Sequence, residues 1–248
     1  MPGPSTTTTT NAPGWTPPPR RTELAPQGRF LFQRHCAVCH GVLGDGRGEM
    51  ASSLIPRPRD FTRGVFKFRS TPSGFLPTDE DLARTIRGGL AGTAMPRFTT
   101  FSDPEIAALI AHLKSLSPRW QQASSYSPPV GTPARPAWMA DGEERRRHVA
   151  AAHTLFRSAC APCHGADGRG TGAAAARWED VWGNPVQPTD LHRGLLRAGR
   201  RPEDVFRVLS TGLDGTPMPS FLESLDAEQR WALATLIADW REPTPAAD

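Results

Sequence analysis

The sequence predicts an all-α protein made of two related units in tandem, each of about 100 residues, the size of one small domain. Two observations support this fold class. Apolar residues recur at helical spacing in several segments, whereas little of the chain shows the alternation that is typical of strands. Short sequences of the first half also reappear in the second half, at an offset of about 124 residues.

Each unit is expected to begin with a helix that leads into a pair of cysteines. In the first unit Phe30, Leu31 and Phe32 precede the cysteines at helical spacing. In the second unit Leu155 and Phe156 do the same. Phe32 and Phe156 each lie four residues before the first cysteine of their pair. The two segments therefore predict equivalent N-terminal helices.

A middle helix and a C-terminal helix are expected in each unit. The middle segments, 79–87 and 202–209, have acidic residues at their start and apolar residues at helical spacing afterwards. The C-terminal segments, 102–116 and 226–240, start with the N-cap candidates Ser or Asp and continue with one apolar face. The sequence between these helices is rich in Gly and Pro, which predicts long loops around a thin core.

The four cysteines of the chain all lie in two Cys-x-x-Cys-His sequences, at 36–40 and 160–164. This is the attachment motif for c-type haem. Two thiols on one helical turn can each form a thioether with a vinyl group of the porphyrin, and the next histidine then lies beneath the ring, where its imidazole can bind iron. We therefore expect two covalent haem c groups. The residues predicted to hold them are Cys36, Cys39, His40, Cys160, Cys163 and His164.

Two other interpretations of the cysteines remain open at this point. Two Cys-x-x-Cys pairs could close one four-thiolate zinc site. A single Cys-x-x-Cys pair could be a thioredoxin-like redox dithiol. Neither interpretation explains why a histidine follows the second cysteine both times, so haem attachment is favoured.

Other short sequences repeat after the motif. The Asp-Gly-Arg-Gly run at 45–48 matches the run at 167–170, and the loop 89–98 matches the loop 212–221. The glycine run resembles a nucleotide-binding loop only superficially, because it follows a haem-binding helix rather than a strand. Flexible backbone close to the haem edge is the simpler explanation.

Met95 and Met218 are the predicted sixth ligands of the two irons. Met95 lies 55 residues after His40, and Met218 lies 54 residues after His164. A thioether suits haem iron, and His/Met ligation raises the reduction potential. A methionine often only fills a gap in a core, but the matching places in a duplicated loop argue against that here. His192 is the rival ligand in the second unit, although a surface or propionate-bonding role is favoured for it.

Arginines near the glycine run are candidates for pairing with haem propionates, because a guanidinium suits bidentate carboxylate contacts. A solvated surface position is the ordinary alternative for each of them, so none is singled out. The candidates are Arg59, Arg63, Arg69 and Arg193.

Each unit resembles a class I c-type cytochrome, and the chain as a whole resembles a tandem diheme cytochrome c over about residues 24–118 and 146–242. The resemblance rests on Cys-x-x-Cys-His-Gly, on Gly-Thr-x-Met-Pro-x-Phe and on the aromatic residue before each motif. It implies that the N-terminal helix packs across the C-terminal helix and that the methionine loop covers the far face of the haem. It also implies one-electron transfer between redox partners in a respiratory chain, with no catalytic residues.

Two alternative functions stay open. A diheme peroxidase-type enzyme needs one iron with an open or displaceable sixth position, and two intact methionine loops argue against it. The chain could also be the haem subunit of a larger membrane-associated oxidoreductase complex. That role is still electron transfer, and the sequence does not separate it from a free carrier.

The net charge of +4 and the pI of about 9.2 predict partners with acidic docking surfaces, since a basic protein is steered toward acidic ones. Nucleic-acid binding is not expected, because the charge is modest and no basic patch is interleaved with aromatic residues. Trp120, Trp138 and Met139 are expected to anchor the linker between the units. The predicted divisions are a disordered Pro/Thr-rich tail at 1–22, domains at 23–118 and 146–243, a linker at 119–145 and a tail at 244–248.

No stretch of the sequence approaches the apolar length of a membrane span, and no hydrophobic signal region stands at its start. Covalent attachment of haem c takes place outside the cytoplasm, so we expect a periplasmic or otherwise extracytoplasmic bacterial protein. A processed chain or a misassigned start codon would reconcile the two points, as would export together with a partner. No cysteine precedes Cys36, so a lipid-anchored N-terminal cysteine is not expected.

Overall fold

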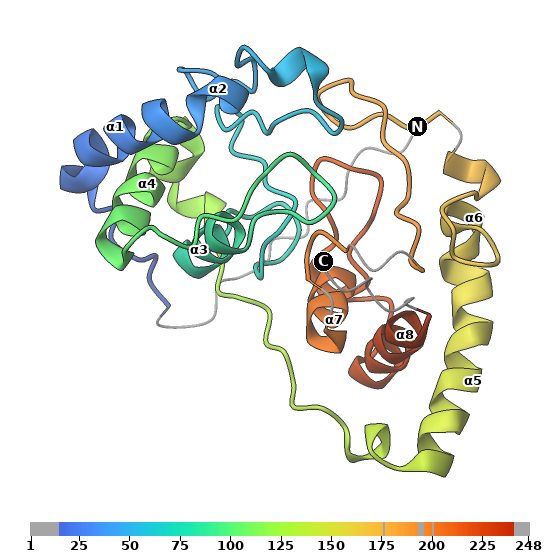
Figure 1. Cartoon of the computed structure of the whole chain (residues 1–248). Helices are drawn as coiled ribbons and strands as arrows, with labels where there is room; N and C mark the ends of the chain where they lie inside the picture. The colour runs from blue at the N-terminus through green and yellow to red at the C-terminus, as the bar shows by residue number, and fades with distance from the viewer. Residues whose placement is uncertain (1–14, 176, 193–195, 200, 241–248) are drawn as a thin grey trace.

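The structure is a computed structural model that describes residues 15–175, 177–192, 196–199 and 201–240. In these ranges it contains helices and loops but no strand, and the one β-bridge joins Glu179 to Pro185. The prediction of an all-α fold is confirmed for this part of the chain. Figure 1 shows two units side by side, the first in blue to green and the second in yellow to red.

The helices follow the predicted order in both units. The first unit contains η1 Thr22–Leu24, α1 Ala25–His35, α2 Ala37–His40, η2 Ala51–Ser53, α3 Asp79–Gly88, α4 Asp103–Ser115, η3 Pro118–Gln121 and η4 Ala123–Ser125. The second contains η5 Ala137–Met139, α5 Gly142–Ala159, α6 Ala161–His164, η6 Ala173–Ala175, α7 Pro202–Thr211 and α8 Ala227–Asp239.

Side-chain caps explain where several helices begin. The Thr78 hydroxyl accepts a hydrogen bond from the Asp81 N–H at the start of α3, and the Asp81 carboxylate accepts from the Thr78 N–H. Asp226 and Gln229 form the same reciprocal box at the start of α8. Such boxes satisfy amide donors that have no partner within the helix. Asp81 and Asp226, two of the acidic residues expected at helix starts, therefore act as caps.

The N-terminal helix of each unit packs across the C-terminal helix, α1 on α4 and α5 on α8 (Figure 1). The first crossing is very close, because a Cβ atom on Gly28 would lie only 1.8 Å from the carbonyl oxygen of Ala108. The equivalent place in the second unit is the buried Ala152. Phe32 and Phe156, each 1% exposed, lie one turn later and anchor the two cores.

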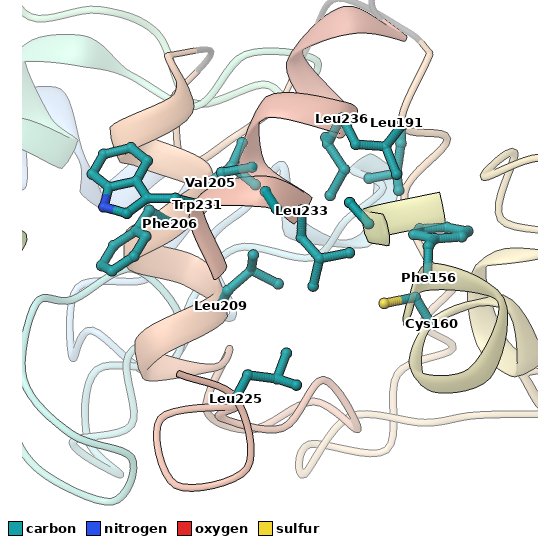
Figure 2. Packing of buried hydrophobic residues seen from close by; sticks show 14 residues of the cluster. Phe156, Cys160, Leu191, Val205, Phe206, Leu209, Leu225, Trp231, Leu233 and Leu236 are labelled. Carbon is teal, nitrogen blue, oxygen red and sulfur yellow. The ribbon is translucent and has the colours of Figure 1, made fainter. Parts of the chain in front are cut away.

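The core of the second unit lies between α5, α7 and α8. Figure 2 shows Phe206 beside Trp231, whose rings stack with centroids 4.5 Å apart. Leu209 and Leu233 continue this cluster toward the cysteine motif. Cys160 belongs to the same buried cluster, so the attachment motif begins within the core.

The first part of the predicted linker packs as part of the first unit. Trp120 is 1% exposed in the first core, and the Tyr126 hydroxyl donates to its carbonyl oxygen over 2.7 Å. Trp138 and Met139 pack against the second core instead. Of the predicted N-terminal tail, residues 1–14 lie outside the described residues, and so does the predicted tail 244–248. Trp15 packs against the first core.

Candidate functional site

Each Cys-x-x-Cys-His motif forms a single helical turn at the end of the N-terminal helix. The His40 N–H donates to the Cys36 carbonyl over 2.9 Å, and the His164 N–H donates to the Cys160 carbonyl over 2.8 Å. Residues three apart lie on the same face of a helix. The turn therefore directs both thiols of each motif to one side, as attachment to one flat ring requires.

A glycine loop closes back on each motif. The Gly46 N–H donates to the His40 carbonyl over 2.9 Å, and the Gly170 N–H donates to the His164 carbonyl over 2.7 Å. Gly46 and Gly170 are therefore equivalent, at the same offset as the two histidines. The match of the Asp-Gly-Arg-Gly runs paired Gly46 with Gly168 and is wrong by two residues. The backbone hydrogen bond to the motif histidine fixes this equivalence, since a positive φ (74° and 80°) is shared by Gly168 at 75°.

The two motif histidines are held in one tautomer. The Nδ1 atom of His40 lies 3.0 Å from the Arg59 carbonyl oxygen, and that of His164 lies 3.3 Å from the Thr189 carbonyl oxygen. A carbonyl oxygen only accepts, so Nδ1 carries the proton and Nε2 keeps its lone pair. Burial lowers the pKa of both imidazoles. A neutral imidazole with a free Nε2 and an oriented ring is the form that binds a metal.

The two methionine loops have the same closure. The Leu90 N–H donates to the Met95 carbonyl, and the Leu213 N–H donates to the Met218 carbonyl, both over 3.1 Å. A threonine hydroxyl two residues before each methionine accepts from the methionine N–H. The equivalence of Met95 and Met218 inferred from the sequence therefore extends to the backbone.

The structure brings the eight predicted site residues together as two groups of four. One cavity, of about 180 Å³, is lined by Cys36, Cys39, His40 and Met95. The other, of about 410 Å³, is lined by Cys160, Cys163, His164 and Met218. Most of the remaining lining is apolar, for example Phe32 and Leu109 in the first cavity. Two thiols, an oriented imidazole and a thioether in an apolar cavity fit a covalently attached haem.

The structure does not support the two alternative interpretations of the cysteines. The pairs lie in separate cavities, and the described residues contain no group of three or more His, Cys, Asp or Glu arranged to hold a metal ion. Burial raises the pKa of the Cys36 and Cys160 thiols to about 11, with a further contribution from Cys39 and Cys163. Redox dithiols need a lowered thiol pKa.

His192, the rival ligand, lies outside the lining of the second cavity. Its ring stacks on Trp240 with centroids 5.2 Å apart. Its Nε2 lies 2.7 Å from the Asp167 carbonyl oxygen and so donates to it. Its imidazole is therefore held by Trp240 and Asp167 outside the lining of the second cavity.

Sequence reasoning missed Lys67, Phe68 and Arg197, which line both cavities. Lys67 and Arg197 follow the matching pairs Arg63-Gly64 and Arg193-Gly194 by the same spacing. This equivalence could have been found from the repeat, but nothing local shows that the two residues meet.

The shared wall is positively charged. Burial lowers the pKa of Lys67 to about 8, and the nearby charges of Arg59 and Arg197 lower it further, against Asp180, which raises it. Burial also lowers the pKa of Arg197. Several cations gathered beside apolar cavities are a suitable environment for anionic carboxylates such as haem propionates.

The arginine candidates for propionate pairing have different surroundings. Arg59 lines the first cavity, and its guanidinium lies 3.8 Å from the ring centroid of Trp182. Arg63 donates to the Val181 carbonyl over 2.6 Å. Arg69 is buried in an ion pair with Asp214, away from the lining of either cavity. Arg193 lies outside the described residues.

The helical fold and its two equivalent cavities define a c-type cytochrome with two haems. The family model described as cytochrome C oxidase, cbb3-type, subunit III matches residues 23–113 and again residues 147–237. The chain therefore belongs to this family of class I c-type cytochromes, as the sequence resemblance predicted, and carries two covalently bound haem c groups. It is a diheme electron-transfer protein.

A solved structure supports the tandem arrangement. The chain is 35% identical to a chain of the Kuenenia stuttgartiensis reducing HAO-like protein complex Kustc0457/Kustc0458, with a TM-score of 0.83. The similarity covers 89% of this chain and 98% of that one. The search of curated proteins finds no match. No helix among the described residues is both long and apolar enough to cross a bilayer.

Proposed function

We propose that the protein relays single electrons between two redox partners through both of its haems. The observation that carries the proposal is the wall shared by the two cavities. Lys67, Phe68 and Arg197 line both of them, so groups bound in the cavities would touch the same side chains. Electron tunnelling falls steeply with distance, and a wall one side chain thick favours transfer between the two sites.

In this proposal Cys36, Cys39, Cys160 and Cys163 form the thioethers, and the irons are ligated by His40 with Met95 and by His164 with Met218. Haem iron supplies the chemistry by cycling between the ferric and ferrous states. The protein orients each imidazole through a backbone carbonyl, encloses the porphyrin in apolar side chains and adjusts the potential by ligand type and nearby charge.

Lys67 and Arg197 would act on both potentials. Each electron that enters adds a negative charge to the site. A cation beside the cavity stabilises that charge, and it does so more strongly where water is partly excluded. Because both residues line both cavities, either charge would raise the potential of both haems.

We further propose an extracytoplasmic respiratory role with acidic partners. Haem c attachment outside the cytoplasm and the net charge of +4 support it. The similar Kuenenia chain comes from a complex, which supports membership of a larger oxidoreductase assembly as one form of this role. A peroxidase-type activity is the less favoured alternative. It would need one iron with an open sixth position, whereas the same hydrogen bonds close the methionine loop in both units.

Flash photoreduction of the holoprotein tests the proposal. In Met218→His the two potentials would be separated, so an electron that first reaches the low-potential haem should move to the other. The expected result is a first-order absorbance change whose rate does not depend on protein concentration. A rate that rises in proportion to concentration would mean that electrons pass only between molecules, and the internal relay would be wrong.

A further inference from the structure

The loop that carries Met218 is fastened to the first unit by one carboxylate. Asp214 accepts hydrogen bonds from the Arg69 guanidinium over 2.6 Å, from the Ser73 hydroxyl over 2.7 Å and from the Gly74 N–H over 2.8 Å. All three donors lie in one short segment of the first unit. Asp214 follows Gly212, the residue with a φ of 68° at which α7 ends and the loop begins.

Arg69 also holds the end of the helix that leads into this loop. Its side chain is 0% exposed, and the same Nη2 donates to the Thr211 carbonyl over 2.7 Å. A buried guanidinium with a carboxylate and a carbonyl as acceptors is a strong and directional contact. Removing one partner of a buried ion pair leaves the other charge uncompensated, so the pair resists separation.

A second set of contacts supports the Met218 loop at Gly215. The Val181 N–H donates to the Gly215 carbonyl over 3.0 Å, and the Val181 carbonyl in turn accepts from Arg63 of the first unit. Trp182 covers Gly215 so closely that a Cβ atom there would lie 2.6 Å from the indole ring. Arg59 of the first unit lies over the same indole. The first unit therefore supports the Met218 loop from two directions.

Among the described residues, the equivalent loop in the first unit has no such support from the second unit. Ala91 occupies the place of Asp214, Gly92 occupies the place of Gly215, and both are exposed. No hydrogen bond among the described residues connects the second unit to residues 89–95. The two loops share their internal closure and differ in what fastens them from outside.

We propose that the first unit holds the Met218 loop closed, with Asp214 as the positioning residue. The bond between Met218 and its iron is then harder to open than the bond made by Met95. This proposal rests on the axial ligation proposed above and goes beyond it, because it makes sulfur ligation at the second haem depend on contact between the units. An incoming ligand such as cyanide should enter at the first haem.

The experiment uses the holoprotein in a Met95→His background, where the near-infrared sulfur-to-iron charge-transfer band reports only Met218. Two quantities are measured on the ferric protein: the temperature at which the band is lost, and the rate of cyanide binding at the second haem. In Asp214→Ala the band should disappear at a lower temperature, and cyanide should bind about 10-fold to 100-fold faster, the range expected for a lost hydrogen bond to a charged group.

Graded and matched variants complete the test. Asp214→Asn should give a band temperature and a cyanide rate between those of the parent and of Asp214→Ala, because its amide oxygen can still accept a hydrogen bond from Ser73 or Gly74. The matched control is Ala91→Asn in a Met218→His background, which should change cyanide binding at the first haem by no more than about twofold, as surface substitutions do. Ser73→Ala, which removes an exposed hydroxyl, should accelerate binding by about 2-fold to 10-fold and serves if Asp214→Ala does not mature.

Two results would overturn the proposal. One is an unchanged band temperature and cyanide rate in both Asp214→Ala and Ser73→Ala. The other is an equal effect of Ala91→Asn at the first haem, which would assign the effect to loop composition instead of contact between the units. Absence of the band in the Met95→His parent is a different result. It would show that Met218 is not a ligand, and the proposed role of Asp214 in holding that ligand would then be wrong as well.

Discussion

Lys67 of the first unit and Arg197 of the second occupy equivalent places in the repeat and both line both haem cavities. The duplicated segments thus meet at the boundary between the units, where each supplies a cation to the other unit's cavity. This relationship connects the two sites physically and electrostatically. It is the observation that supports the proposed coupling of the two haems.

The first prediction is the number of covalent haems. Properly matured protein should show two haem additions by mass spectrometry after denaturation, because thioether bonds survive unfolding. Replacing Cys36 and Cys39 by Ser should leave one addition, on the peptide that contains Cys160 and Cys163. Fewer than two additions on the native chain would contradict the assignment of the four cysteines as attachment residues.

The second prediction concerns the axial methionines. Met95→His should lower the potential of the first haem, and Met218→His that of the second, because an imidazole stabilises ferric iron better than a thioether does. The shift should exceed about 59 mV, which is tenfold in a one-electron equilibrium. Potentiometric titration followed in the visible spectrum measures it. Should His192→Ala alter the second haem's spectrum while Met218→Ala does not, the ligand assignment is wrong.

The third prediction concerns the shared cationic wall. Lys67→Met and Arg197→Gln should each lower both potentials by tens of millivolts, on the order of one nearby charge in a partly aqueous setting. Arg145→Gln is the control, because Arg145 pairs with Asp239 between α5 and α8 and lines neither cavity. A change in the potential of only one haem would mean that the charge of the substituted residue does not act on both haems.

The same lysine predicts a pH dependence. Burial lowers the pKa of Lys67 to about 8, so its charge is present below that pH and lost above it. A cation favours the ferrous state, and therefore both potentials should be constant at lower pH and fall as the pH rises past this value. Propionates beside Lys67 would move the step to higher pH. Lys67→Met should abolish the step, and a step that persists in this variant would assign it to another group.

The fifth prediction distinguishes a carrier from an enzyme and tests steering. The native protein should turn over peroxide slowly and show no high-spin haem, because the proposed methionine ligands would fill both sixth positions. Reduction by an acidic protein partner should slow as salt is added, since screening shortens the reach of the field. A small neutral reductant is the control and should show little salt dependence. Rapid peroxide turnover with a high-spin haem would favour the peroxidase alternative.

Much of the fold was accessible from the sequence because its signals are local. The spacing of Cys36, Cys39 and His40 is set by one helical turn, and the acidic starts of α3 and α8 cap adjacent amides. The equivalence of Met95 and Met218 follows from a repeat that also preserves the backbone bonds of their loops. The helical class and the two haem c groups were predicted correctly on these grounds.

The pairing of the two glycine runs was predicted wrongly, because their matching sequences do not occupy matching places in the backbone. The Asp-Gly-Arg-Gly runs align by composition, yet the hydrogen bonds of Gly46 and Gly170 to the motif histidines fix a different register. Backbone geometry needs an N–H and a positive φ at one place, and it leaves the neighbouring side chains free. The Asp and Arg residues are therefore shifted by two positions between the units, whereas glycines occupy the equivalent backbone places in both.

The sequence by itself determined what depends on neighbours along the chain: the helices, the attachment motifs and the paired methionines. Only the tertiary structure decided what depends on contact between the units. It places Lys67 and Arg197 between the cavities, and it pairs Arg69 with Asp214 instead of with a haem propionate. The physical reason is that helical spacing and capping act over a few residues. The partners of a buried charge are set by the packing of surfaces more than 100 residues apart, as the 145-residue separation of Arg69 and Asp214 illustrates.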